Sequence, residues 1–384
     1  MSAEIILKDI IFNLQRIIFY IALVFSKLYY PTHKRSILII GIETANLLNL
    51  YSKIFNGFSI NINNNPSYKN KYNIDFSKFP RAIQLIVLPA LFPFFIKRFH
   101  SFWYISLGAF FISNDGRLWE HSILKKYNVQ ILSFYMGSDI RSYNLAMNAA
   151  ILAQLDHHTF YSSENLSNNL IELNDIKSKK YSLASDTHSD YIFNFPVDNI
   201  SYINRDVYAP PLVLERNRFL INNSKWKNLE RIKILHCPSN PMLKGTQLVK
   251  AAIKKLQVEG YQFDFTLLSG VPHIEVMTAL DESHIVLNEF YCSTPGIFGL
   301  ESLEANCLLL TSASIEHEPI LFEGSDQAWV VTYYWQIYDN LKFYLDNFSL
   351  ALDKANSATL WAKKYYSHDA AKNYLESIVN SEKT

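Results

Sequence analysis

One stretch of the sequence, from His236 to Cys307, contains two places where an apolar run ends in a turn and a helical pattern follows. In the first, Lys244 and Gly245 lead into a helical pattern over 248–257. In the second, the glycine-rich turn PGIFG enters a helix that carries Glu301 and Glu304. A lysine at one helix start and backbone N–H groups at another both attract anions. The stretch therefore predicts a domain that binds a diphosphate with a ribose beside it.

Short apolar runs alternate with helical patterns along both halves of the chain, which is typical of parallel sheets. Polar, proline-containing sequence over 204–227 separates the halves, and 384 residues are enough for two domains. The sequence therefore predicts an α/β protein with two Rossmann-like domains. The predicted strands are 36–42, 58–63, 101–108, 129–137, 157–163, 232–239, 263–270, 284–290 and 307–313; the predicted helices include 43–55, a helix capped by Ser163, and 273–282.

Charge and cysteine content exclude some functions. The formal net charge is +1, which gives no electrostatic case for nucleic acid as a partner. The three cysteines have no paired or metal-type spacing, which fits a reducing compartment. His157 and His158 are adjacent, and adjacent residues of a strand point to opposite faces, so we expect no metal there. No cofactor is expected.

The first thirty residues predict an amphipathic helix rather than a secretory signal, because no small-residue cleavage site follows. At 100° per residue one side of this helix is polar and the opposite side is apolar. The helix either lies in the interface of an anionic membrane or packs on its own domain, and amphipathicity alone does not separate these readings. The polar side holds Lys8, Asp9, Asn13, Gln15 and Arg16, the apolar side holds Ile6, Ile10, Ile17 and Ile21, and the basic cluster His33-Lys34-Arg35 follows.

A second apolar segment, 82–99, carries Pro89 and Pro93 and ends in Lys97 and Arg98. Two prolines argue against a straight spanning helix, and they predict a broken helix. Such a helix suits a surface that meets lipid or a lipid-linked substrate. The alternative is a helix buried in the domain core.

The second half of the chain resembles the retaining family-four glycosyltransferases, which have two facing Rossmann-like domains, the GT-B architecture. In that family a Lys-Gly pair follows the first strand of the second domain, and the lysine contacts the donor diphosphate; Lys244 matches it. A glycine-rich turn also leads to a glutamate that contacts the nucleotide ribose, and Glu304 matches that residue. The family's first glutamate, which contacts the transferred sugar, is replaced here by Gly296. Ser239 and Asn240 stand where the family has a basic residue.

The first half carries a GSDIR turn at 137–141, which is similar to a turn that faces the cleft in relatives. Tyr135 and Met136 precede it, where relatives often have a histidine. The resemblance makes Asp139 and Arg141 candidates for contact with the acceptor or the sugar. From the residues alone, an ion pair or a helix cap is the alternative.

These observations define the candidate site. Asp139 and Lys244 are the candidate catalytic residues. The candidate donor-binding residues are Ser239, Asn240, Lys244, Gly245, Gly296, Phe298, Gly299, Leu300 and Glu304. The candidate acceptor- or sugar-binding residues are Gly41, Gly137, Ser138, Asp139 and Arg141.

The resemblance implies a metal-independent glycosyltransferase that moves a sugar, with retention, from a nucleotide-diphosphate sugar to a glycan. We expect a lipid-linked acceptor, surface-polysaccharide or O-antigen assembly, and a peripheral location on the inner face of the cytoplasmic membrane. The alternative is a non-catalytic partner that binds a nucleotide sugar or glycan within a membrane-bound assembly. The expected divisions are a membrane-associating helix over 1–35, an acceptor domain over 36–208, a nucleotide-sugar domain over 209–359, and a C-terminal helix over 360–384 that packs back on the acceptor domain.

Overall fold

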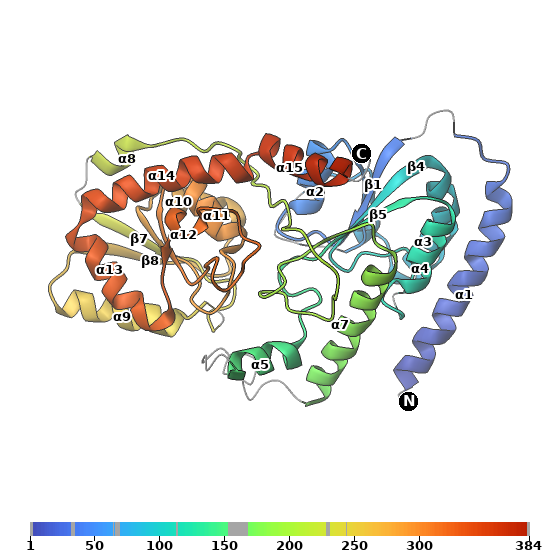
Figure 1. Ribbon diagram of the computed structural model, residues 1–384, viewed down its shortest axis with the longest axis horizontal. Coiled ribbons are helices and arrows are strands. Elements are labelled where there is room, and N and C mark those ends of the chain that lie inside the picture. The colour runs from blue at the N-terminus through green and yellow to red at the C-terminus, as the bar shows by residue number, and fades with distance from the viewer. Residues whose placement is uncertain are drawn as a thin grey trace. The chain divides into compact units, whose positions relative to one another are not determined.

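The computed structural model describes residues 3–31, 35–63, 65, 70–112, 114–152, 168–227, 231–242 and 244–381. The chain divides into two compact units (Figure 1). The first is Met1–Ala149 with Glu164–Pro210, and the second is Ala150–Ser163 with Pro211–Thr384. The sequence places the boundary after residue 208. The predicted strand 157–163, with its histidine pair, and the cap Ser163 lie outside the described residues.

The first unit is built on a six-stranded sheet in which every pair of neighbours is parallel. Its order, β3-β2-β1-β4-β5-β6, is the doubly wound order of Rossmann domains. Because β1 and β4 are neighbours, the chain changes direction across the sheet between them. The strands are β1 (Arg35–Gly41), β2 (Phe58–Asn61), β3 (Ile74–Asp75), β4 (Phe99–Ile105), β5 (Gln130–Phe134) and β6 (Tyr191–Phe193).

The central strands are covered on both faces, as their unbroken apolar runs require. Leu38, Ile39 and Ile40 of β1 are each fully buried, although successive side chains point to opposite faces. The connecting helices include α2 (Leu47–Ile54), the 3₁₀ helix η1 (Phe76–Lys78), α4 (Leu118–Lys126), α5 (Tyr143–Leu152) and α7 (Asn168–His188). Helix α2 begins later than predicted, because Ala45 and Asn46 adopt positive φ angles.

Helix α1 (Ala3–Ser26) packs along helix α3 (Arg81–Arg98). Part of its polar side lies against the domain: buried Gln15 donates to the Leu85 carbonyl at 3.0 Å, and Asp9 accepts from the Asn114 amide. Phe19 on the same side is fully buried. The helix therefore does pack on its own domain, and the side that faces the domain includes much of the predicted polar side.

The opposite side of α1 is apolar and exposed. Its exposed apolar residues, which we call the α1 stripe, are Ile6, Leu7, Ile10, Leu14, Ile17, Tyr20, Ile21, Val24 and Phe25. By length and composition the segment Ile6–Ser26 could cross a membrane. Helices of the same length and composition also occur in soluble cores and signal sequences, so this property alone assigns no location.

Helix α3 corrects one expectation. The two prolines predicted a broken helix, yet Arg81–Arg98 is one continuous helix with Pro89 and Pro93 inside it. Both prolines are buried, together with Leu88, Phe92, Phe95 and Ile96. Packing of this apolar side in the domain core outweighs the hydrogen bonds that the prolines forgo. Much of the segment is therefore buried core, the alternative that the sequence left open.

The second unit has a five-stranded parallel sheet of order β11-β10-β9-β7-β8. The change of direction lies between β7 and β9, whose register pairs Ile234 with Ile285. The strands are β7 (Ile232–His236), β8 (Phe263–Leu267), β9 (Ile285–Leu287), β10 (Leu308–Thr311) and β11 (Val330–Val331). The helices up to residue 346 are α8 (Asn223–Lys227), α9 (Thr246–Val258), α10 (His273–Glu282), α11 (Gly296–Glu304), α12 (Ser325–Ala328), η2 (Tyr334–Gln336) and α13 (Ile337–Asp346).

The end of the chain forms two helices, α14 (Phe348–Tyr366) and α15 (His368–Ser381), rather than one helix beginning at 360. Ser367 is extended between them, with φ −65° and ψ 156°, and its hydroxyl caps α15 by accepting from the Ala370 N–H. Thr359 of α14 donates to the Leu303 carbonyl, which ties α14 to α11. Packing of the C-terminal end on the first unit stays a prediction.

Candidate anion-binding site

The candidate site of the second unit lies at the carboxyl edge of its sheet, beside the neighbouring strands β7 and β9. Lys244 follows β7, and Glu289 lies just beyond the end of β9. A crevice opens at such a change of direction, because the connections on either side of it leave in opposite directions. Ligands of open α/β sheets bind at this position.

Lys244 and Glu289 form an ion pair between Nζ and Oε2. The lysine side chain is 17% exposed and the glutamate side chain 5% exposed. The lysine is therefore held at the edge of the sheet and not extended into solvent. The pair is long-range, since its partners lie 45 positions apart.

His236, the last residue of β7, fixes the start of α9. Its Nδ1 lies 2.6 Å from the Leu287 carbonyl of β9, and its Nε2 lies 2.9 Å from the Thr246 hydroxyl. Burial lowers the pKa of His236 to about 4, so the ring is neutral near pH 7. The sequence analysis did not select this residue, whose partners come from two other elements.

The turn before α9 is closed by its own backbone. The Lys244 N–H donates to the Asn240 carbonyl at 3.1 Å, and Gly245 adopts φ 68° at the helix start. This φ favours glycine over residues that carry a Cβ. Ser239 and Asn240 are exposed, and the Asn240 side chain caps the Met242 N–H. Lys244 is thereby held beside the first turn of α9.

The start of α11 lies against Glu289. Gly296 adopts φ 60°, and a Cβ there would lie 3.4 Å from Glu289 Oε1. The Glu289 carboxylate therefore lies close to both Lys244 and this helix start. The first N–H groups of a helix have no partner within it, so they add positive potential here.

The remaining residues of the glycine-rich turn differ in role. A Cβ at Gly299 would lie 2.8 Å from Asn288 Nδ2, so glycine is required for α11 to pack on the end of β9. Phe298 is half-buried. Leu300 is fully buried in the core, so a ligand can meet only its backbone.

Glu301 faces His273, the first residue of α10. Its Oε1 lies 2.7 Å from His273 Nε2, and this hydrogen bond raises the pKa of His273. Glu215 lies 3.8 Å from the other ring nitrogen. The Glu301 side chain is only 6% exposed.

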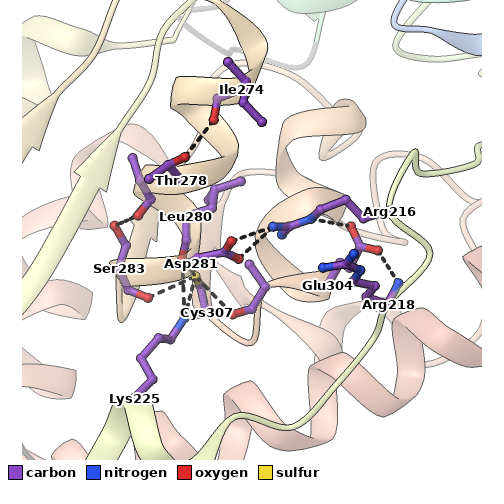
Figure 2. Close-up of polar contacts among 12 residues, drawn as sticks. Arg216, Arg218, Lys225, Ile274, Thr278, Leu280, Asp281, Ser283, Glu304 and Cys307 are labelled. Carbon is purple, nitrogen blue, oxygen red and sulfur yellow. Dashed lines mark hydrogen bonds and ion pairs between the residues drawn. The ribbon is translucent and has the colours of Figure 1, made fainter.

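Glu304, at the end of α11, is engaged by the segment that enters the second unit (Figure 2). Its Oε1 accepts from the Arg218 N–H at 2.6 Å. Its Oε2 lies 3.8 Å from Arg216 Nε, and Arg216 also bridges to Asp281 of α10 at 2.7 Å. Burial raises the pKa of Glu304. Within the described part of the chain, Glu304 Oε2 is buried without a hydrogen-bond donor.

Lys225 of α8 ties together the ends of α10 and α11 (Figure 2). Its Nζ donates to the Ala305 carbonyl at 2.7 Å and contacts Cys307 Sγ at 3.4 Å. A cation is stabilised at helix C-termini, where carbonyls are left unpaired. Its Nζ also lies 3.5 Å from the Leu280 carbonyl, so Lys225 links the C-terminal ends of the two helices that carry His273 and Glu301.

In the first unit, residues 137–141 follow β5. Gly137 and Ser138 are exposed, and a Cβ at Gly137 would have nothing within 4 Å. Asp139 Oδ2 accepts from the Met136 N–H at 2.8 Å, and burial raises the pKa of Asp139 to about 6. The Asp139 carboxylate is thus held at the carboxyl edge of this sheet.

Arg141 is bound within its own domain. It bridges to Asp198 at 2.9 Å, and both side chains are less than 10% exposed. Gly41 has a packing role, because a Cβ there would lie 2.6 Å from Ile105 Cβ.

Glu43, which the sequence analysis did not select, is buried at the end of β1. Its carboxylate accepts from the Leu48 and Asn49 N–H groups and from the Tyr72 hydroxyl. It therefore caps α2, and its partners from the loop after β2 could not be read from local sequence.

No family model matches the chain, and no curated protein matches it in sequence. Solved structures do match over most of its length. Sucrose-phosphate synthase from Thermosynechococcus elongatus aligns with 8% identity and a TM-score of 0.58, covering 91% of this chain and 99% of that one. A glycosyltransferase from Rickettsia africae aligns with 10% identity and a TM-score of 0.53, with the same coverage. These likenesses confirm the expected fold class, an α/β protein with two Rossmann-like domains of the GT-B type.

Proposed function

We propose that the protein is a glycosyltransferase whose second unit binds a nucleotide-diphosphate sugar. One observation carries the proposal: a largely buried lysine is held at the change of direction of a parallel sheet, with the starts of α9 and α11 nearby. Lysine charge and helix N-termini together bind phosphate groups. The proposal is supported by the GT-B type fold and by the match of Lys244 and Glu304 to the family pattern.

In this proposal the diphosphate binds Lys244 and the turn around Gly296 and Gly299. When the sugar leaves, negative charge develops on the diphosphate, and Lys244 and the α11 N-terminus stabilise it. These groups supply positive charge that a divalent ion supplies in other enzymes, so transfer is proposed to proceed without a metal. Retention of configuration rests on the family resemblance.

The nucleotide ribose is proposed to bind Glu304. Its Oε2 has no hydrogen-bond donor among the described residues, and a ribose hydroxyl is a donor. The Arg216 side chain beside it is 21% exposed, so this side chain can shift to admit the hydroxyl. Ser239 and Asn240, exposed in the preceding turn, are proposed to line the same site.

The acceptor glycan is proposed to bind the carboxyl edge of the first sheet, at Gly137, Ser138 and Asp139. Gly137 leaves open space there, and Asp139 has a raised pKa. A carboxylate of pKa about 6 can hold or accept a proton from a hydroxyl near neutral pH. Arg141 is proposed to support this turn through its bridge to Asp198.

The proposed location is the inner face of the cytoplasmic membrane, with a lipid-linked acceptor in surface-polysaccharide assembly. The α1 stripe supports it: nine apolar residues face outward along a helix whose other side is fixed to the domain. Exposed apolar surface of this extent on a helix suits a lipid interface. In this arrangement α1 lies flat between lipid and protein. Exposed Lys8 and Lys27 near its two ends suit anionic headgroups.

A screen of purified protein against nucleotide sugars tests the function. A donor at 100 times its Kd raises the free energy of unfolding by about 2.7 kcal/mol, which thermal denaturation detects. Sugar release or transfer from the stabilising donor then supports an enzyme. Stabilisation without turnover, with lipid-linked acceptors supplied, would support the non-catalytic alternative instead.

A further inference from the structure

Hydrogen bonds fix the backbone of Glu289, whereas its carboxylate contacts Lys244 from another element. Its carbonyl accepts from the Ser312 N–H at 2.9 Å and the Thr311 hydroxyl at 3.1 Å, which anchors the residue to β10. Its carboxylate extends into the space bounded by Lys244 and the start of α11. Any rearrangement of Glu289 is therefore a side-chain rotation.

Gly296 determines how much space that carboxylate has. A Cβ there would lie 3.4 Å from Glu289 Oε1, and any longer side chain would enter the space between them. The positive φ of Gly296 also disfavours L residues at this position. The carboxylate of Glu289 thus occupies the position beside the lysine, on the side where α11 presents no side chain.

A diphosphate that binds Lys244 changes the charge balance around Glu289. Before binding, the lysine charge compensates the carboxylate, which is almost fully buried. After binding, two anions share one cation, and a buried carboxylate without a partner is costly. The carboxylate then needs new hydrogen-bond donors close to the diphosphate. A sugar attached to that diphosphate places hydroxyl donors next to the outer phosphate, whereas a free nucleoside diphosphate has no hydroxyl donor at that end.

We propose that Glu289 determines specificity for the intact donor by holding Lys244 in the empty site and accepting hydroxyls of the transferred sugar in the loaded site. The proposal rests on the proposed function, and it adds a recognition rule. The donor satisfies Glu289, while the nucleoside diphosphate left after transfer does not, so product binds more weakly and leaves.

Calorimetry on the full chain tests this rule with three matched pairs: UDP and UDP-glucose, GDP and GDP-mannose, and ADP and ADP-glucose. For the pair that binds, the wild type should favour the sugar conjugate. Glu289→Gln keeps the size of the side chain and removes its charge. It should tighten binding of the free diphosphate by about tenfold and reduce the preference for the conjugate, because it removes the repulsion between two adjacent anions.

Two variants serve as controls. Glu301→Gln neutralises a neighbouring buried carboxylate that pairs with His273, and it should leave the preference unchanged. Glu289→Asp keeps the charge and should tighten binding of the free diphosphate less than Glu289→Gln does, which gives a second reading if the glutamine variant is unstable. The proposal is supported if the free diphosphate binds more tightly to Glu289→Gln than to the wild type and Glu301→Gln shows no such change.

Failure of the proposed role of Glu289 and failure of the proposed function give different results. If binding depends on Lys244 but the preference is equal in wild type and Glu289→Gln, the role of Glu289 is overturned and the proposed function stands. If none of the six nucleotides binds the wild-type chain, the proposed function fails, and the role of Glu289 fails with it.

Discussion

Gln15 accepts a hydrogen bond from the backbone N–H of Ile112 at 2.7 Å, which fixes the polar side of α1 to the first unit. Gln15 thus faces the domain, whereas the polar side chains of a surface helix usually face water. The α1 stripe therefore faces outward, and this orientation underlies the proposed membrane contact.

Charged residues on the α1 stripe should weaken lipid binding. Ile10 and Ile17 are each more than half exposed, so the double change Ile10→Glu/Ile17→Glu should leave the fold intact. Binding to phosphatidylglycerol-containing vesicles should fall about tenfold or more, because each isoleucine gives about 1.5–3 kcal/mol on burial. Co-sedimentation measures it.

Val258→Glu is the matched control, since Val258 is 74% exposed in the second unit, and this variant should bind vesicles like the wild type. Wild-type protein that stays in the supernatant with anionic vesicles at low salt would rule out the membrane role.

Glu304 and Glu301 should contribute unequally to nucleotide binding. Glu304→Gln should weaken binding of the nucleoside diphosphate by about tenfold, because a hydrogen bond to a charged group contributes about 1.5–3 kcal/mol. Glu301→Gln should have the smaller effect, since its carboxylate is paired with His273. Equal losses, or a larger loss in Glu301→Gln, would show that the assignment of the ribose site to Glu304 is wrong.

Asp139 should make the protein less stable as pH rises from about 4 to about 6. Burial raises its pKa to about 6, so over this range the folded protein holds a proton that the unfolded chain releases. Stability from this group is present at low pH and is lost on ionisation. Relative to Asp139→Asn, the wild type should lose on the order of 2 kcal/mol across that window. Urea denaturation at pH 4 and pH 6.5 measures it, and parallel curves for both proteins would contradict the shifted pKa.

Removal of α15 tests the predicted packing of the C-terminal end. Because α14 is tied to α11 through Thr359, the chain should be cut after Tyr366 rather than before Leu360. If α15 packs on the first unit, the shortened chain should lose stability and transfer activity while binding nucleotide normally. A shortened chain that keeps full stability and activity would contradict the predicted packing of α15 on the first unit.

The sequence predicted the central strands because they are continuous apolar runs, such as Leu38, Ile39 and Ile40 of β1, which are buried on both faces. It did not predict the two-residue strands β3 and β11. It placed helix α10 with the bounds that the structure shows. It misplaced the start of α2, because positive φ angles at Ala45 and Asn46 depend on the Glu43 cap and its long-range partners.

The candidate site was only partly predictable. Lys244 and Gly296 stand in local motifs, so spacing revealed them. Glu289 and His236 acquire their roles from partners on other elements, and the Lys244–Glu289 pair spans 45 positions. Contacts of that kind follow from the order of strands in the sheet, which local patterns do not determine.

Binding of the donor that the nucleotide-sugar screen identifies, compared between wild type, Lys244→Ala and Lys250→Ala, tests the central claim most directly. Lys250 lies on the exposed side of the same helix, α9, and serves as the matched control. We predict that Lys244→Ala weakens binding about 10- to 100-fold, as expected for a charge-assisted contact to a buried phosphate, while Lys250→Ala binds normally. Equal affinities in all three proteins, with each shown to be folded by thermal denaturation, would contradict the assignment of the donor site to Lys244.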